Sequence, residues 1–322
     1  MLDQAIHFSP YLKSVIWGGE RLASYKGVAT DQSSIGESWE ISAVPGHVSV
    51  VDRGELKGKS LTELISIYGA ELVGRDIYKK YGENFPLLIK LIDARDDLSV
   101  QVHPDDELAR KRHNCPGKTE MWHVIETAPD AKIYVGLKEE ITPDEYERRV
   151  ADNTIMDVIC AYDSAPGDTF FLPAGRMHAI GAGNLLAEIQ ETSDITYRIY
   201  DYDRRDKDGN PRQLHTEEAR DAIDYRVYPS YKSEPVDSVL ADCEYFVVRK
   251  YEAGEKAVDI QLDRESFTII MCLKGEVRVD YAVDAEAPRR SVTIGQGDTW
   301  LFPATVRSIK VEGEGEILSV NA

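Results

Sequence analysis

The chain has 322 residues, of which 42% are apolar, so it is long enough for two domains and a sizeable buried core. Its 57 acidic and 38 basic side chains give a formal net charge of −19 at pH 7. This charge argues against nucleic acid as a partner, because a duplex-binding protein needs a clustered basic surface and the sequence has no long run of Lys or Arg.

The amino-terminal segment and the cysteines indicate a cytoplasmic protein. The first residues, MLDQAIHFSPYLKSVIWGG, lack the basic start and long apolar core of a secretory signal. The sequence contains no stretch of about 18 apolar residues, so we expect no membrane span. The cysteines form no CxxC pair, which indicates reduced thiols and argues against a cysteine-based zinc site. The cysteines are Cys115, Cys160, Cys243 and Cys272.

Helix signals lie in the first two thirds of the chain. SLTE at 60–63 has the form of a capping box before an apolar run, and TPDE at 142–145 has the same form with Pro143 at the first helical position. HPDDELARKRH predicts a helix after Pro104, with acids in its first turn and bases in its last. HTEEARDAID, from 215, predicts a further helix.

The rest of the sequence favours β-strands. The run at 267–283, FTIIMCLKGEVRVDYAV, predicts two strands joined by a hairpin at KGE. Many short strands with Gly and Pro between them favour a sandwich or barrel. Segment 227–238 has two prolines and little periodicity. We therefore expect two domains, residues 1–232 with the helical insertions and residues 233–322 as a second β domain.

An internal repeat supports this division. PGDTFFLPAGRMHAIGAGN at 166–184 is similar to GQGDTWLFPATVRSIKVEG at 295–313. The shared GDT and Pro-Ala residues predict one β unit that occurs twice. In this register His178 of the first copy falls on Ser308 of the second. The two copies therefore differ at a residue that can bind a metal.

The segment LIDARDDLSVQVH ends an apolar run with a glutamine and a histidine two residues apart. Side chains two apart in a strand lie on the same face, so Gln101 and His103 point the same way, with Ser99 beside them. Either this face is exposed to solvent, or the two side chains point inward as ligands of one bound group.

Residues 166–184 resemble the second signature of a cupin barrel. The resemblance implies two cupin-type (jelly-roll) β-barrels, the first carrying the helices, with His178 facing into the first barrel. It also implies a pair of ligands, here supplied by QVH, and a downstream glutamate. In the strand TEMWHVIE, Glu120 and Trp122 share one face while His123 lies on the other. Glu120 is therefore the candidate ligand, and His123 is expected to pack or to form hydrogen bonds.

The proposed ligand set is Gln101, His103, Glu120 and His178. Two imidazoles, one carboxylate and one amide oxygen suit one divalent ion per chain, with zinc the first choice and iron, manganese or cobalt as alternatives. A further position can remain for water or substrate. His113, in the polar end of a predicted helix, is expected to be solvated.

Several motifs together resemble the type I phosphomannose isomerases in their short bacterial form. They include GESWEIS at 36–42, QVHPDD at 101–106, GKTEMW at 117–122, SDITYR at 193–198 and RQLH at 212–215. The resemblance covers nearly the whole chain. It implies a metal-dependent aldose–ketose isomerase that interconverts mannose 6-phosphate and fructose 6-phosphate through an enediol.

The resemblance also assigns site residues. The family's metal ligands fall on the four residues already proposed, its active-site arginine on Arg198 and its active-site lysine on Lys118. Lys90 and Ser99 are expected near the sugar or phosphate together with Lys118 and Arg198, and Glu188 and Asp194 match acidic pocket residues.

The residue that moves the proton stays open at this point. Glu188, Lys118 with Asp194, and a metal-bound water are all candidates. Trp17 and Trp39 are left out of the site because tryptophans are also large core residues. We expect a monomer or weak homodimer.

Two other functions fit part of this pattern. An iron-dependent cupin oxygenase also uses two histidines and a carboxylate, but GKTEMW and the basic residues argue against it, and it would consume oxygen. A metal-stabilised sugar-phosphate binding module would bind a hexose phosphate without turning it over. The second β unit, with Ser308 in place of the histidine, is expected to be non-catalytic and to stabilise the first unit.

Overall fold

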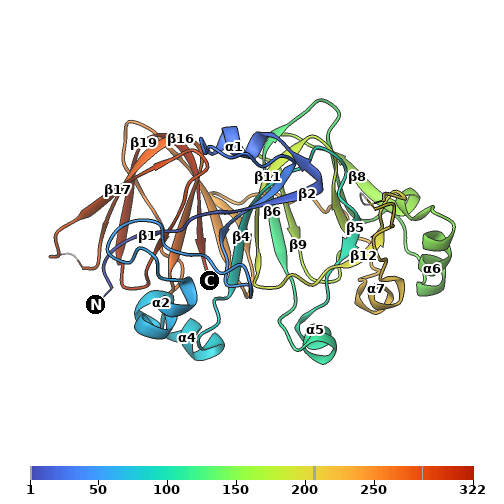
Figure 1. The fold of residues 1–322 in the computed structure, drawn as a ribbon, viewed down its shortest axis with the longest axis horizontal. Coiled ribbons are helices and arrows are strands. Elements are labelled where there is room, and N and C mark those ends of the chain that lie inside the picture. The colour runs from blue at the N-terminus through green and yellow to red at the C-terminus, as the bar shows by residue number, and fades with distance from the viewer. Residues whose placement is uncertain (1, 206–207, 285) are drawn as a thin grey trace.

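The computed structural model describes residues 2–205, 208–284 and 286–322, and it consists mainly of β-sheets connected by loops and short helices (Figure 1). Two sheets come from the amino-terminal part of the chain, and the third lies at the opposite end of the molecule and contains the carboxy-terminal strands. The sequence prediction of a mainly β protein with helical insertions is therefore confirmed.

Neighbouring strands within each sheet are antiparallel. The six-stranded sheet has the order β2 (Tyr11–Gly19), β3 (Ile35–Ile41), β4 (Leu87–Asp93), β11 (Asn184–Glu191), β6 (Glu120–Thr127) and β9 (Thr169–Leu172). The five-stranded sheet has the order β12 (Tyr197–Tyr200), β5 (Val100–Val102), β10 (His178–Ile180), β7 (Lys132–Leu137) and β8 (Ile159–Asp163).

The eight-stranded sheet contains the second copy of the internal repeat. Its main path is β1 (Ile6–His7), β18 (Thr299–Phe302), β16 (Thr268–Ala282), β19 (Ser308–Asn321), β14 (Val247–Ala253) and β13 (Val239–Asp242). β15 (Val258–Asp259) pairs with β19, and β17 (Arg290–Gly295) pairs with β16. Within the described residues, none of the three sheets is closed into a ring by strand pairing.

The two helices predicted from capping motifs begin at those caps. Ser60 forms a complete capping box with Glu63 at the start of α2 (Leu61–Tyr68), and Thr142 accepts from the Glu145 amide at the start of α6 (Pro143–Ala151). The predicted helices after Pro104 and from 215 are α5 (Asp106–His113) and α7 (Thr216–Ala222). The remaining helical segments are α1 (Arg21–Tyr25), α3 (Ala70–Val73), α4 (Arg75–Tyr81) and the 3₁₀ turn η1 (Ile155–Val158).

The sheets stack because the six-stranded sheet is apolar on both faces. One face meets the five-stranded sheet in a cluster that includes Trp122, Leu172 and Val135. Its other face, through residues such as Met121 and Ile189, packs with the eight-stranded sheet in one continuous core. Helices α6 and α7 cover the outer face of the five-stranded sheet. The amino-terminal part of the chain is therefore a two-sheet sandwich with a further β unit against its back.

The two copies of the repeat fold in the same way. Gly167 and Gly297 both have positive φ, 92° and 81°, at the turn that precedes β9 and β18. Gly167 donates to the carbonyl of Val124, and Gly297 donates to the carbonyl of Cys272. The strands that follow pair with β6 and β16 in the same register. The shared glycines and aspartates therefore mark a real structural repeat.

The predicted hairpin at KGE is wrong. Residues 268–282 form one 15-residue strand, β16, and Gly275 lies at φ 75° beside a register shift between Cys272 and Lys274. β19 runs alongside almost the whole of β16, so the backbone groups on both sides of the irregularity keep a partner. The glycine therefore makes a bulge in a long strand, where local sequence predicts a turn.

The chain crosses between the two ends of the molecule more than once. β1, near the amino terminus, pairs with β18 of the eight-stranded sheet. The shared core contains Phe85 of the amino-terminal part and Phe267 of the carboxy-terminal part, whose ring centroids lie 4.6 Å apart. No helix among the described residues is long and apolar enough to span a membrane.

We expect a fragment of residues 1–232 to be insoluble or unstable. Truncation removes the partner strand of β1 and exposes the apolar back of the six-stranded sheet. Solubility, thermal unfolding and activity of the fragment test this, and co-expression of residues 233–322 should restore a soluble complex. A soluble fragment with full activity contradicts the prediction.

Candidate active site and metal centre

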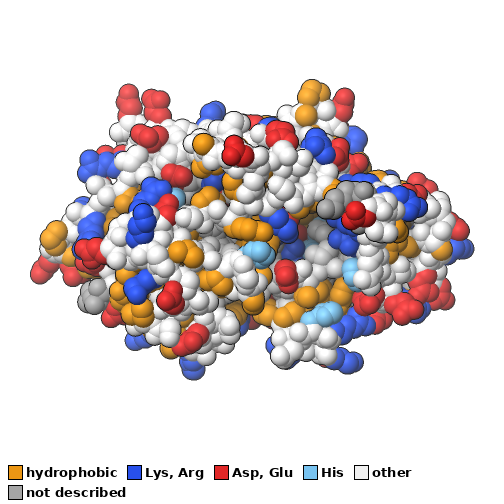
Figure 2. Space-filling view, in the orientation of Figure 1, with side chains coloured by type: hydrophobic (Ala, Val, Ile, Leu, Met, Phe, Trp, Pro, Cys, Tyr) orange, Lys and Arg blue, Asp and Glu red, His pale blue; other side chains and the backbone are white. Residues whose placement is uncertain are grey.

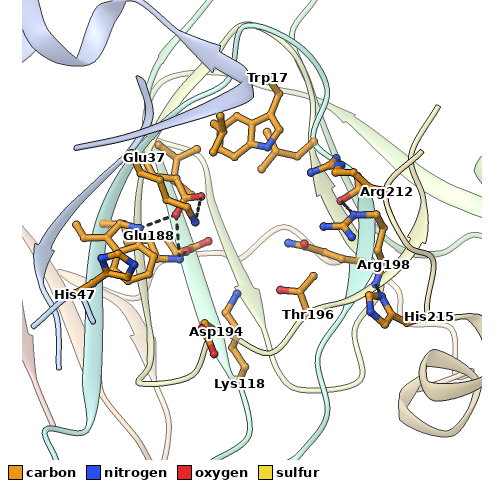
Figure 3. A pocket seen from close by; sticks show the side chains of 18 residues that line it. Trp17, Glu37, His47, Lys118, Glu188, Asp194, Thr196, Arg198, Arg212 and His215 are labelled. Atoms are coloured by element: carbon orange, nitrogen blue, oxygen red, sulfur yellow. Dashed lines mark hydrogen bonds and ion pairs between the residues drawn. The ribbon is translucent and has the colours of Figure 1, made fainter. Parts of the chain in front are cut away.

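A pocket of about 440 Å³ lies between the two sheets of the sandwich (Figure 3). It opens as a hollow in the face drawn in Figure 2, with basic and histidine side chains at its edge. Most of its lining is polar or charged. The six-stranded sheet supplies one wall, β5 and β12 supply the opposite wall, and loops around 118 and 194–196 supply the floor.

A cluster of metal-ligating side chains borders the pocket, made by His103, Glu120 and His178. His103 Nε2 lies 3.1 Å from His178 Nε2. Glu120 Oε2 lies 3.5 Å from His103 Nε2, and Glu120 Oε1 lies 3.2 Å from His178 Nε2. Ligand atoms at tetrahedral corners, each about 2.0–2.2 Å from an ion, are about 3.3–3.6 Å apart. The three side chains are therefore spaced as ligands of a single ion.

Backbone carbonyls fix the orientation of both imidazoles. His103 Nδ1 lies 2.9 Å from the carbonyl oxygen of Ile195, and His178 Nδ1 lies 2.8 Å from that of Arg176. Because a carbonyl oxygen only accepts, each Nδ1 carries the proton and each Nε2 keeps its lone pair toward Glu120. Burial, together with the nearby Lys118 ammonium, lowers the pKa of His103 to about 3, so this imidazole is neutral at physiological pH.

The carboxylate of Glu120 is fully buried and short of partners. Neither of its oxygens accepts a hydrogen bond of normal geometry from a described residue, although Lys118 Nζ lies 2.9 Å from Oε2. Burial favours the neutral acid, but the adjacent Lys118 ammonium favours the carboxylate, and the pKa of Glu120 lies well below its usual value. A buried anion with free lone pairs beside two imidazole nitrogens fits a divalent cation.

Gln101 extends the cluster toward the pocket. It pairs directly with His178 across β5 and β10, and its Nε2 lies 3.2 Å from His178 Nε2. The oxygen and nitrogen of a side-chain amide exchange places by a half turn, so Oε1 can face the same centre. Gln101 and His103 point the same way, because both approach His178 Nε2, and Ser99 lines the pocket together with Gln101.

Two other histidines stay outside the cluster. His123 is buried on the opposite face of β6, where its Nδ1 lies 2.9 Å from Thr169 Oγ1, as its strand position predicts. His113 is exposed, as expected, but its Nε2 is also 2.7 Å from the hydroxyl of the buried Tyr197. The alternation along β6 therefore separates Glu120, which belongs to the cluster, from the neighbouring His123.

The wall made by the six-stranded sheet carries a closed network of charges. Lys90 Nζ lies 2.8 Å from Glu188 Oε1 and 2.7 Å from Gln190 Oε1, and Trp122 Nε1 donates to Glu188 Oε2 at 2.8 Å. Lys90 also lies 3.8 Å from Glu37. Although burial opposes its charge, Glu188 and Glu37 raise the pKa of Lys90, so its ammonium stays protonated.

The opposite wall carries guanidinium groups. Arg198 Nε lies 3.3 Å from Ser99 Oγ, and its Nη1 donates to the carbonyl of Gln213 at 3.0 Å. Among the described residues, no carboxylate lies within ion-pair distance of Arg198. Burial and the neighbouring Arg212 lower the pKa of Arg198. Figure 3 shows Arg198 and Arg212 side by side, across the pocket from Glu37 and Glu188.

The floor brings together the predicted Lys118 and Asp194. Lys118 is almost fully buried, and its Nζ lies 3.1 Å from His103 Nε2, so it contacts the ligand cluster and the pocket at once. Asp194 is exposed at the pocket floor near Lys118, with Thr196 beside it (Figure 3). All of the predicted site residues therefore either line this pocket or belong to the adjoining ligand cluster.

Several lining residues were missed from the sequence. Trp39 Nε1 donates to Glu37 at 2.7 Å, and the Trp39 ring contacts Tyr11 and His47. Some of these residues belong to the motifs GESW and RQLH, but the sequence around each motif does not show that the two motifs meet in one pocket. The lining residues without a predicted role are Lys13, Val15, Trp17, Glu37, Trp39, His47, Ile92, Leu98, Thr196, Arg212 and His215.

A buried metal-ligand cluster beside a basic pocket in a β-sandwich is the arrangement of a metal-dependent enzyme for a small anionic substrate. The sequence model of the family "Phosphomannose isomerase type I, catalytic domain" matches residues 6–124. The chain is 35% identical to mannose-6-phosphate isomerase ManA of Bacillus subtilis over 99% of both chains. It is also 35% identical to a mannose-6-phosphate isomerase of Streptococcus mutans over 94% of both.

Solved structures agree with these sequence relationships. The crystal structure of a mannose 6-phosphate isomerase from B. subtilis matches with a TM-score of 0.86 and 31% identity, covering 99% of both chains. A putative mannosephosphate isomerase from Archaeoglobus fulgidus matches with a TM-score of 0.80 and 25% identity, over 98% of this chain and 97% of that one. The chain belongs to the type I mannose-6-phosphate isomerase family.

We expect Glu120→Gln to lower the divalent-metal content of the purified protein from about one ion per chain to a small fraction of that. The substitution keeps the shape of the side chain and removes the anionic charge at the centre of the cluster. Metal content measured by mass spectrometry tests this. The matched control is His123→Asn, a buried histidine on the same strand but outside the cluster. Equal metal loss in both variants contradicts the assignment.

Proposed function

We propose that this pocket interconverts mannose 6-phosphate and fructose 6-phosphate by moving one proton between C2 and C1 of the open-chain sugar. The observation that carries the proposal is that Lys118 and the guanidinium of Arg198 line one pocket, which the cluster of metal-ligating side chains borders. The reaction needs an acid–base group, positive charge near the C1 and C2 oxygens, and an anchor for the phosphate. Family membership supports the same aldose–ketose isomerisation.

We propose that His103, Glu120, His178 and the amide oxygen of Gln101 hold one divalent ion. When bound there, such an ion supplies Lewis-acid polarisation of the sugar's hydroxyl and carbonyl oxygens. Zinc is our first assignment because nitrogen and oxygen ligands at tetrahedral spacing suit it, and iron, manganese or cobalt would suit the same donors less specifically. The unpartnered Glu120 oxygens support a cation at this position.

We assign the proton transfer to Lys118. It lies at the border of cluster and pocket, and its ammonium is a compact group that can carry a proton to or from the sugar. Glu188 is a weaker candidate, because Lys90 and Trp122 hold both of its oxygens and fix it as a charged, oriented acceptor for sugar hydroxyls. Asp194, at the floor near Lys118, is placed to exchange protons with solvent.

The phosphate is assigned to the wall of Arg198. On the opposite wall, Lys90 and Lys13 face Glu37 and Glu188, so that wall offers no net positive charge to a dianion. Arg198 has no described carboxylate partner, and its guanidinium can grip a phosphate through two parallel N–H donors. Ser99, hydrogen-bonded to Arg198, adds a hydroxyl donor at the same place.

We further propose that both β units are cupin-type jelly rolls, with the boundary at 232/233 and the catalytic site only in the first. The repeated glycine turn and identical strand registers support one ancestral unit. A monomer or weak homodimer and a cytoplasmic location remain predictions. The segment 227–238 that we take as the boundary still contacts the first unit, because the hydroxyl of Tyr231 donates to the carbonyl of Leu137.

The decisive test is conversion of mannose 6-phosphate to fructose 6-phosphate by the purified protein, before chelation, after chelation and after zinc is added back. We expect activity, its loss by at least about 100-fold on chelation, and its recovery with zinc. Cobalt, manganese and iron added back in parallel identify the preferred ion. Hexose-phosphate binding without turnover under every metal would contradict the isomerase and favour a binding module. Oxygen consumption with bound iron would favour an oxygenase.

We expect Lys118→Gln to lower kcat by about 10²–10⁴-fold, the usual contribution of an acid–base group. Exchange of the C2 proton of mannose 6-phosphate with deuterium oxide should fall equally, at unchanged metal content. Lys13→Gln, in the same pocket but away from the ligand cluster, is the matched control. If Glu188→Gln abolishes exchange while Lys118→Gln retains it, Glu188 is the base.

A further inference from the structure

Arg212 is a pocket residue that no part of the proposed mechanism uses. It lies in the segment before α7, and its guanidinium lines the pocket beside Arg198 (Figure 3). Its Nε donates to Asp201 Oδ2 at 2.7 Å, and its Nη2 contacts Asp201 Oδ1. The two contacts fix the plane of the guanidinium, because the fork of an arginine matches the two oxygens of a carboxylate.

Asp201 is built to hold Arg212. It is 5% exposed and also accepts from Arg204 Nη2 at 2.5 Å, while Arg204 Nη1 contacts the carbonyl of Asp97. Burial works to raise the pKa of Asp201, but hydrogen bonds from Arg212 and Arg204 outweigh it and lower the pKa, so the carboxylate stays ionised. Arg204 supports Asp201 from outside the pocket, because it is not among the lining residues.

The described charges on this side of the pocket do not balance. Arg198, Arg204 and Arg212 contribute three positive charges, and Asp201 contributes the one negative charge that contacts any of them. Two guanidinium groups therefore stand side by side at a solvent-accessible wall. Burial lowers the pKa of Arg198 most, and the positive charge of Arg212 lowers it further. Such crowding of like charges is stable when an anion lies between them.

We propose that Arg212 is a second anchor for the substrate phosphate, and that Asp201 is the residue that positions it. This inference rests on the proposed function, since it assigns the charged end of the same substrate. Arg198 and Arg212 then hold different oxygens of one dianionic phosphate, while Asp201 keeps Arg212 from turning out into solvent. The pair selects phosphorylated hexoses over neutral ones through binding, with no part in the proton transfer at C1 and C2.

The test measures binding of inorganic phosphate and of mannose 6-phosphate by the zinc-loaded, full-length protein. Calorimetry gives Kd for phosphate, and steady-state assays give KM and kcat. We expect Arg212→Gln to weaken phosphate binding about 10- to 100-fold and to raise KM by a similar factor, with kcat changed less than about threefold. Arg212→Lys, which keeps the charge and loses the fork, should recover part of this loss.

Two further variants separate positioning from folding. Asp201→Asn should weaken phosphate binding in the same direction, because Arg212 loses its ionic support. Arg205→Gln is the matched control, since Arg205 lies in the same segment but is exposed and donates to the carbonyl of Gly209. It should change Kd and KM less than about twofold. Thermal unfolding of each variant shows whether a loss of binding merely reflects a loss of folded protein.

The outcomes separate the two proposals. If Arg212→Gln leaves phosphate Kd and substrate KM within about twofold of the unmodified protein, or lowers kcat alone, the anchor is refuted. A folded, zinc-loaded protein that binds no phosphate at all refutes it as well. If phosphate binding depends on Arg212 but mannose 6-phosphate is not isomerised, the anchor stands and the proposed reaction fails.

Discussion

The site depends on one constraint, the buried negative charge of Glu120. A carboxylate removed from water costs several kcal/mol unless a cation or hydrogen-bond donors compensate it, and the oxygens of Glu120 accept no hydrogen bond of normal geometry from the described residues. Lys118 supplies part of the compensation, and the lone pairs of His103 and His178 face the same point. A divalent ion at that point would satisfy all of these groups at once, and its binding would then be linked to folding.

The sandwich places that charge beside the pocket. β6 turns Glu120 and Trp122 toward the five-stranded sheet and Met121 toward the eight-stranded sheet, so one strand serves the site with one face and the core with the other. The charge-balanced wall, with Lys90 and Glu188, and the cationic wall, with Arg198, belong to different sheets. A sugar phosphate with its reacting carbons at the metal cluster and its phosphate at Arg198 would therefore lie across the gap between the sheets.

The second β unit has the same strand pairing as the first but no carboxylate at the position of Glu120. Glu120 pairs with Leu172 and Gln190, and Thr268 pairs in the same register with Phe302 and Asn321. Thr268 therefore stands where the first unit has the carboxylate of Glu120. Ser308 falls on His178 in the sequence repeat, and apolar side chains such as Ile270 and Ile317 fill the interior. With no ligands to hold, this unit presents its outer face to the six-stranded sheet and completes the shared core.

The sequence by itself determined what neighbouring residues control. The period of two put Gln101 with His103 and Glu120 away from His123. The capping motifs located α2 and α6, and the charge pattern after Pro104 located α5, because each signal acts over a few residues. The family motifs supplied the reaction. The tertiary structure alone decided that KGE continues β16, since a partner strand on both sides of the bulge outweighs a local turn preference. It also brought Arg212 beside Arg198, because contacts between segments far apart in the chain depend on sheet pairing and packing, which no local pattern records.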